Sequence, residues 1–229
     1  MALLNVRSLL NKTFIINDLI LDNNIDCMFL TETWLSSDGP ATLLEASPPN
    51  YKFSFSSRTG KRGGGTATII SAAFSIKNIT FEEYTSFEYH CLVFNSPQIL
   101  CLTVYRPPKR WPTFCLANLN RIIILGDFNL HIDNQSDSLA SEFLNMLNCM
   151  NFIQHVTQPT HNKGHILDSI ITHGLDASIS SVVDVGISDG FNQENIAEGM
   201  VTKRYLTPEV TPNAESPGET RKLRQDALH

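Results

Sequence analysis

The sequence predicts an α/β fold of the sandwich type, in which two packed mixed β-sheets are flanked by helices in four layers. Three observations predict it. Many short apolar segments have the length and β-branched content of strands. A strand, a helix and a second strand follow one another at the N-terminus, which is the order of a crossover unit. The 229 residues, of which 42% are hydrophobic, are enough to bury a large core.

The N-terminal elements alternate between strand and helix. Residues 2–6 have the composition of a short apolar strand, and residues 11–24 place apolar side chains at helical spacing. Residues 25–31 then indicate a buried strand. A polar, proline-containing loop is expected between this strand and residue 50.

The middle of the chain is predicted to consist of strands joined by short turns. Tyr51, Phe53 and Phe55 alternate with polar or basic residues, as in a half-buried strand over residues 51–57. The further strands expected in this part are residues 66–70, 74–79, 88–95 and 98–105.

The last elements surround one predicted helix. Residues 122–125 form a continuous apolar run, which indicates a strand buried on both faces. Residues 138–148 carry an apolar stripe at helical spacing, and residues 166–172 and 180–187 are the final strands. The composition then turns polar, with almost no apolar periodicity. We therefore predict a domain over residues 1–190 and a disordered tail over residues 191–229.

Charge and cysteine usage limit the classes of function. The net charge of −6 argues against DNA binding through a general basic field, but it allows local basic contacts. Five cysteines without a Cys-x-x-Cys pair favour buried reduced thiols in an intracellular protein. We expect no signal peptide and no membrane partner, since no apolar run approaches the ~20 residues of a membrane helix.

The segment R-I-I-I-L-G-D-F-N-L-H-I-D, residues 121–133, is the most informative in the chain. Its apolar run stops at Gly126, where the backbone can turn, and then presents Asp127 and Asn129. Residues two apart in an extended segment share a face. A carboxylate and an amide at the mouth of a sheet can orient a water and hold a phosphate oxygen. This is the equipment of a hydrolase that acts on phosphate esters.

Other polar residues also lie at strand ends or inside strands. Each has a plain structural explanation: Glu32 as a surface carboxylate, Asn5 as a helix cap, and Tyr105 as a core ring. Asp168 is harder to explain in this way, because a carboxylate in a buried strand is costly unless it is paired. Taken together, these residues predict one shared site.

These residues stand in motifs that occur in a fixed order. The motifs are L-N-V-R-S-L at Asn5, T-E-T-W-L at Glu32, Arg62-Gly63-Gly64-Gly65, Y-R-P-P at Tyr105, G-D-F-N, H-I-L-D-S-I-I at Asp168, and Ser188-Asp189. The ordered set resembles the endonuclease/exonuclease/phosphatase superfamily. Within it, the chain is most similar to the apurinic-type endonuclease domain of non-LTR (LINE-like) retrotransposons. The resemblance spans about residues 2–190.

The resemblance implies a monomeric endonuclease that nicks DNA by phosphodiester hydrolysis with Mg²⁺, or Mn²⁺, and that once shared a polyprotein with a reverse transcriptase. Mg²⁺ prefers oxygen ligands, and one or two carboxylates suffice to hold it. Glu32 is then the main metal ligand, assisted by Asn5 and Asp189. Asp127 orients or deprotonates the attacking water, and Asn129 positions the phosphate.

The resemblance also implies contacts with the substrate. Tyr105 donates to a phosphate oxygen, and Asp168 maintains the hydrogen bonds of the site. Thr160 in Q-P-T-H contacts DNA beside the scissile phosphate. Arg62 and Arg106 are candidates for contacts with the DNA backbone, with a solvated loop charge as the alternative.

The chain departs from the family pattern in three places. Ser-Asp-His is replaced by Ser188-Asp189-Gly190, and glycine cannot donate, accept or carry charge. Loss of such a donor typically costs a factor of ~10²–10³ in rate. The following strand is not evident in residues 191–205, and the helix expected before Gly126 is shortened to residues 109–120. We therefore expect a fold that lacks its last strand and one helix, with impaired activity, as in a decayed mobile element.

Three functions compete. The first is a DNA-nicking endonuclease, favoured by Y-R-P-P, Thr160 and G-H-I-L-D. The second is a phosphatase of the same superfamily that acts on a small or lipid phosphate. The third is a catalytically inactive remnant or binding module with the same fold, favoured by Gly190.

Overall fold

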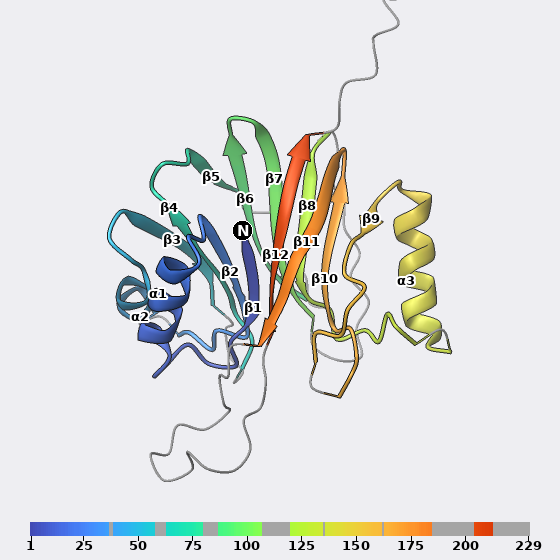
Figure 1. Ribbon diagram of the computed structural model, residues 1–229, viewed down its shortest axis with the longest axis horizontal. Helices are drawn as coiled ribbons and strands as arrows, with labels where there is room; N and C mark the ends of the chain where they lie inside the picture. The colour runs from blue at the N-terminus through green and yellow to red at the C-terminus, as the bar shows by residue number, and fades with distance from the viewer. Residues whose placement is uncertain are drawn as a thin grey trace, which may run out of the picture.

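The structure is a computed structural model that describes residues 1–36, 39–57, 63–79, 87–106, 120–134, 136–161, 163–184 and 204–212. Within these ranges the strands form two six-stranded sheets, each with parallel and antiparallel neighbours. The sheets pack face to face, with helices on the outside (Figure 1). The predicted class, an α/β sandwich of two mixed sheets, is confirmed.

The first sheet has the strand order β11-β12-β1-β2-β4-β3. β1 and β2 are parallel, and the other neighbours are antiparallel. The bounds of its strands are Ala2–Asn5 for β1, Cys27–Thr31 for β2, Tyr51–Ser56 for β3, Thr66–Ser71 for β4, Leu175–Asp184 for β11 and Arg204–Pro212 for β12.

The second sheet has the strand order β5-β6-β7-β8-β10-β9, with β7 and β8 parallel. The bounds of its strands are Ile76–Ile79 for β5, Glu88–Asn95 for β6, Gln98–Tyr105 for β7, Ile122–Asp127 for β8, Ile153–Gln154 for β9 and Asp168–His173 for β10. β8 lies between β7 and β10, which explains why its apolar run is continuous: every residue of β8 is buried.

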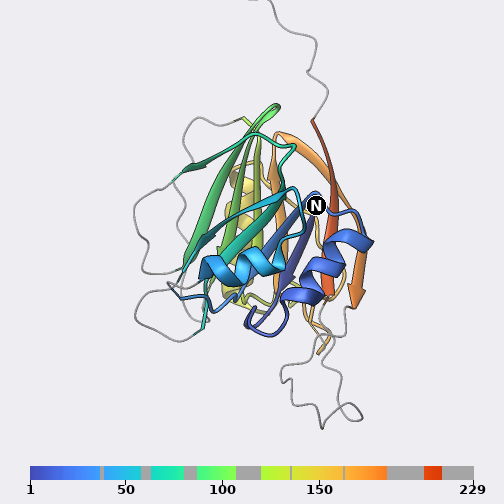
Figure 2. The ribbon, with the colours of Figure 1, turned by 90° about the vertical axis from the view of Figure 1, so that its left-hand side faces the viewer.

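The described helices cover the outer faces of the two sheets. α1 (Thr13–Asp22) and α2 (Gly39–Ala46) pack on the first sheet, and α3 (Ser138–Cys149) packs on the second. Figure 2 shows α1 and α2 on the near side and α3 on the far side. α3 begins after Asp137, whose carboxylate accepts from the first free N–H groups of the helix. None of the described helices is long and apolar enough to cross a membrane.

Three apolar layers hold the four structural layers together. One joins α1 and α2 to the first sheet, and one joins α3 to the second. The middle layer lies between the sheets and contains Phe29 from β2 and Leu125 from β8. Side chains alternate between the faces of a strand, so each buried strand supplies two of these layers. The packing fixes the strand ends of both sheets relative to one another, and the candidate site lies at those ends.

Two sequence predictions need correction. The loop expected before residue 50 contains α2, a short helix stabilised by packing of Leu43 and Ala46 against α1 and the first sheet. The segment predicted to be a disordered tail contributes β12 at residues 204–212. β12 lies between β1 and β11, with Leu206 opposite Leu3. The two prolines and the weak alternation of β12 do not indicate a strand locally. Pairing with two neighbouring strands stabilises it. The shortened segment 109–120 lies almost wholly outside the described residues.

Candidate functional site

The polar residues predicted from the sequence lie at neighbouring strand ends of both sheets. Asn5 is the last residue of β1, and Glu32 directly follows β2. On the second sheet Tyr105 ends β7 and Asp127 ends β8, while Asp168 begins the antiparallel β10. In the sheet register, Asp127 stands opposite both Tyr105 and Asp168.

The strand ends that carry Asn5, Glu32, Tyr105, Asp127 and Asp168 form one rim of the sandwich. The Asn5 amide connects the two sheets at this rim. Its Nδ2 donates to Glu32 Oε1 at 3.2 Å and to Asp127 Oδ2 at 2.7 Å. Its Oδ1 accepts from the backbone N–H of Arg7 at 3.2 Å, which fixes the orientation of the amide. Residues separated by 122 positions in sequence are therefore in direct contact.

Three carboxylates lie near one another at the amide bridge. Asp127 is 4% exposed, and its pKa is raised well above the ordinary value, first by burial and then by the charges of Asp168 and Glu32. The hydrogen bonds from the Asn129 N–H and the Asn5 amide oppose this rise in pKa. A carboxyl group of raised pKa in a concentration of negative charge is suited to accept a proton, and it favours a nearby cation.

Arg106 stabilises the turn after β8 through hydrogen bonds to Phe128 and Asn129. The Arg106 guanidinium is 1% exposed and donates through Nη1 to the Phe128 carbonyl at 3.0 Å, while the Arg106 carbonyl accepts from Asn129 Nδ2 at 2.8 Å. Burial lowers the pKa of Arg106. The expected contact of Arg106 with the DNA backbone is thus at odds with its burial. Arg106 is buried because it packs against this turn, and the sequence alone does not distinguish it from an arginine on the surface.

The backbone is strained at two of these positions. Glu32 has φ of 53° and Asn129 has φ of 48°, in the left-handed region that non-glycine residues seldom adopt. Such conformations persist only where the surroundings enforce them, and they concentrate at functional sites. For Asn129 the enforcement is visible: its N–H donates to Asp127 Oδ1 at 2.9 Å, and its side chain donates to Arg106.

Thr160 positions the start of β10. It is 6% exposed, and its Oγ1 accepts from the N–H groups of Leu167 at 3.0 Å and Asp168 at 3.1 Å. The hydroxyl predicted to touch DNA therefore also supports the backbone that carries Asp168.

The glycine-rich loop that contains Gly64 and Gly65 lies next to Glu32, because it is hydrogen-bonded to the residues that follow Glu32. The Gly64 carbonyl accepts from the Trp34 N–H at 2.8 Å, and the Gly65 N–H donates to the Glu88 carboxylate. Gly64 has φ of 77°, a backbone conformation that favours glycine, and a Cβ there would displace the Glu88 carboxylate. Arg62 in this loop and Asp189 with Gly190 lie outside the described residues.

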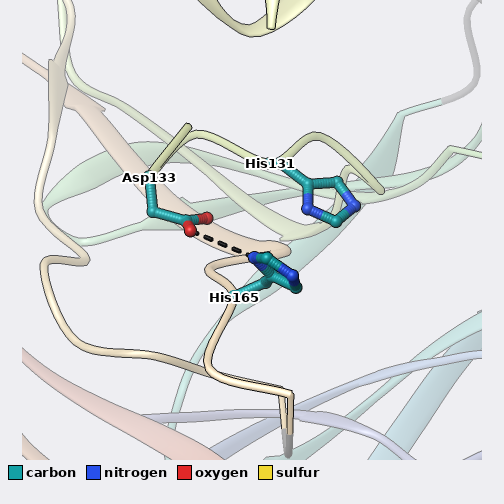
Figure 3. A group of neighbouring side chains, drawn as sticks. All are labelled: His131, Asp133 and His165. Carbon is teal, nitrogen blue, oxygen red and sulfur yellow. Dashed lines mark hydrogen bonds and ion pairs between the residues drawn. The ribbon is translucent and has the colours of Figure 1, made fainter. Parts of the chain in front are cut away.

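The sequence reasoning did not identify a second polar cluster, formed by His131, Asp133 and His165 (Figure 3). Its signal was present as H-I-D shortly after G-D-F-N, two potential ligands close together in the sequence. In the structure they lie in a turn, in which the Asn134 N–H donates to the His131 carbonyl at 2.9 Å. The third member was visible only as an isolated histidine in G-H-I-L-D.

The sequence matches the endonuclease/exonuclease/phosphatase family over residues 2–191, which is most of the chain. The chain belongs to this family. The family assignment agrees with the resemblance stated from the motifs. No protein with a curated description matches the sequence.

Several solved structures share the fold at low sequence identity. The endonuclease domain of TRAS1, a telomere-specific non-LTR retrotransposon, is 10% identical with a TM-score of 0.63, over 90% of this chain and 96% of that domain. The 3′ phosphatase NExo from Neisseria, bound to a product DNA hairpin, is 14% identical with a TM-score of 0.60, over 92% and 99%. The AP endonuclease LMAP from Leishmania major is 11% identical with a TM-score of 0.60, over 90% and 86%.

Proposed function

We propose that this chain is a divalent-metal-dependent phosphodiesterase domain of the DNA-nicking type, derived from a non-LTR retrotransposon and impaired by Gly190. The observation that carries the proposal is the Asn5 amide, which joins Glu32 of one sheet to Asp127 of the other. A family member whose acidic residues converge in this way has the groups needed to hold a cation and a phosphate.

The donor set at the rim suits Mg²⁺ or Mn²⁺. Glu32 supplies a carboxylate, a hard oxygen donor of the kind that Mg²⁺ prefers. Asn5 offers its Oδ1, which accepts from the Arg7 N–H and keeps a second lone pair for an ion. The raised pKa of Asp127, caused by burial and by the charges of Asp168 and Glu32, records negative charge that a cation would relieve. Asp189 is a further proposed ligand. When bound, the ion neutralises the phosphate and stabilises the leaving oxygen.

The residues around Glu32 have separate tasks in this proposal. Asp127, with its raised pKa, takes a proton from the attacking water. Asn129 positions the phosphate for attack by this water, and Tyr105 donates to a phosphate oxygen. Asp168 stands opposite Asp127 and sustains its raised pKa.

The contacts with substrate are assigned on the same basis. Thr160 lies beside Asp168 and borders the scissile phosphate, and Arg62 contacts the DNA backbone. Arg106 acts as a positioning residue, because its buried guanidinium holds the backbone carbonyl of Phe128. With DNA as its substrate, the chain is proposed to act as a monomer inside the cell, in the nucleus.

Two observations bear on the choice of substrate. The motifs Y-R-P-P and G-H-I-L-D favour the retrotransposon branch over a phosphatase, and the endonuclease domain of TRAS1 shares the fold. Gly190 supports a second candidate, an inactive remnant with the same fold, because glycine cannot replace the donor histidine of Ser-Asp-His.

A plasmid-nicking assay with Mg²⁺ separates these functions. It compares the protein with Glu32→Ala, with Gly190→His and with Glu142→Ala, a matched control on the exposed face of α3. We expect weak nicking that Glu32→Ala abolishes, that Glu142→Ala leaves unchanged and that Gly190→His raises by ~10²-fold or more. Nicking seen only with Gly190→His identifies the inactive remnant. Turnover confined to small phosphate esters identifies a phosphatase and overturns the proposal.

A further inference from the structure

Three side chains outside the proposed catalytic site converge between two loops (Figure 3). His131 and Asp133 come from the loop between β8 and α3, and His165 comes from the loop before β10. Their potential ligand atoms all lie within 4.8 Å of one another. His165 Nδ1 is 3.1 Å from Asp133 Oδ2, and the two imidazole rings lie 4.3 Å apart between centroids.

We propose that His131, Asp133 and His165 form a second metal site that binds a borderline divalent cation such as Zn²⁺. Two imidazoles and one carboxylate are a donor set that zinc accepts and that magnesium does not prefer. Two ligand atoms on a tetrahedral zinc ion are about 3.3 Å apart, given metal–ligand distances of about 2.0–2.1 Å. The 3.1 Å separation of His165 Nδ1 from Asp133 Oδ2 therefore already matches one edge of the coordination sphere. Water completes it.

The carboxylate is held in place for this role. Asp133 Oδ1 accepts from the Ile166 N–H at 2.9 Å, which leaves Oδ2 directed at His165. A ligand oriented by a backbone donor loses less freedom when the ion binds.

The position of the cluster gives the ion a structural consequence. The carbonyl of His165 accepts from the N–H groups of Thr160 and His161, each at 3.0 Å, and the Thr160 hydroxyl holds the N–H of Asp168. An ion bound at His165 and Asp133 would thus fasten the loop after β8 to the loop that carries Thr160 and that leads into Asp168 at the start of β10. Zinc would stabilise the substrate-facing side of the rim without taking part in the proposed chemistry.

The plain alternative is that the 3.1 Å contact between His165 and Asp133 only joins two loops. That explanation leaves out His131, whose ring lies against His165 although the side chain is only partly buried. The two explanations predict different behaviour toward zinc.

The test is a Zn²⁺ titration of the full chain against a fluorescent chelator, followed by Co²⁺ substitution to record the visible d–d spectrum. We expect one ion per chain and a tetrahedral Co²⁺ spectrum. His131→Ala and His165→Ala should each weaken zinc binding by more than ~100-fold. The matched control is His173→Ala, a histidine of β10 whose ring contacts the Asn151 carbonyl outside the cluster.

Two further measurements make the result decisive. The His131 ring takes no part in the hydrogen bonds that join Asp133 to His165 and Ile166, so His131→Ala decides the matter if His165→Ala fails to fold. Glu32→Ala should abolish nicking and leave zinc binding unchanged, which keeps this site separate from the proposed function. Zinc binding by His131→Ala that lies within ~10-fold of the His173→Ala control would overturn the proposal, as would the absence of a stoichiometric ion in the wild-type chain.

Discussion

Replacing Asn5 by alanine tests the bridge between the two sheets. The Asn5 amide donates to Glu32 Oε1 at 3.2 Å and to Asp127 Oδ2 at 2.7 Å. Hydrogen bonds to charged groups each contribute about 1.5–3 kcal/mol. Asn5 is only partly buried, so water partly replaces the lost donor. We therefore expect Asn5→Ala to lower the free energy of unfolding by about 2 kcal/mol, below the sum of two such bonds.

The same substitution should also affect metal binding and the titration of Asp127. Without the amide, the pKa of Asp127 rises further, because that hydrogen bond lowers it in the wild-type chain. The loss of one proposed ligand should weaken Mg²⁺ binding by ~10–100-fold. Any nicking activity should need a higher pH, since Asp127 must be ionised to accept a proton.

The assay is urea unfolding at neutral pH, with and without Mg²⁺, combined with calorimetric titration of the ion. Asn95→Ala is the matched control, because its amide donates one hydrogen bond, to Ser75 Oγ at 2.8 Å, at the exposed end of β6. The control should change stability by less than about 0.5 kcal/mol. If Asn5→Ala unfolds at the control's urea concentration and binds Mg²⁺ as the wild type does, the bridge has no role and the reasoning fails.

Three more predictions follow from buried contacts. Burial lowers the pKa of His90 to about 4, from its ordinary value of 6.5. As the pH falls from about 6.5 to 4, only the unfolded chain takes up a proton at this histidine, so the free energy of unfolding should drop by about 3 kcal/mol. His90→Gln should flatten this pH dependence. Gly126→Ala would place a Cβ 1.8 Å from a β7 carbonyl and should cost more than about 3 kcal/mol in urea unfolding, against about 1 kcal/mol for Gly164→Ala, where the space is open. Thr160→Val should cost about 2 kcal/mol by leaving two N–H groups unpaired, with Thr160→Ser near wild type.

The strands were predictable because their signal is local. The run at β8 indicates a buried strand from its own residues, and its neighbours β7 and β10 explain it. α2 and β12 were not predictable from their own residues. α2 is eight residues long and depends on packing against α1, and β12 contains two prolines and depends on pairing with β1 and β11.

In the site, too, local features could be predicted and long-range contacts could not. That Asn5, Glu32 and Asp127 lie at strand ends could be predicted, because apolar runs stop there. Which atoms meet could not be predicted, since the bridging hydrogen bond spans 122 positions and depends on the packing of two sheets. Burial of Arg106 and the pairing of Asp133 with His165 depend on the same long-range packing.

The most direct test of the central claim, that Asn5, Glu32 and Asp127 make one cation site, is the position of a Mn²⁺ ion. Anomalous scattering from crystals grown with Mn²⁺ locates the ion whether or not the chain is active. The account predicts a peak within coordination distance of the Glu32 carboxylate, beside Asn5, that is lost in Glu32→Ala. Manganese found elsewhere on the chain, with the Glu32 carboxylate making no contact to it, would contradict the account.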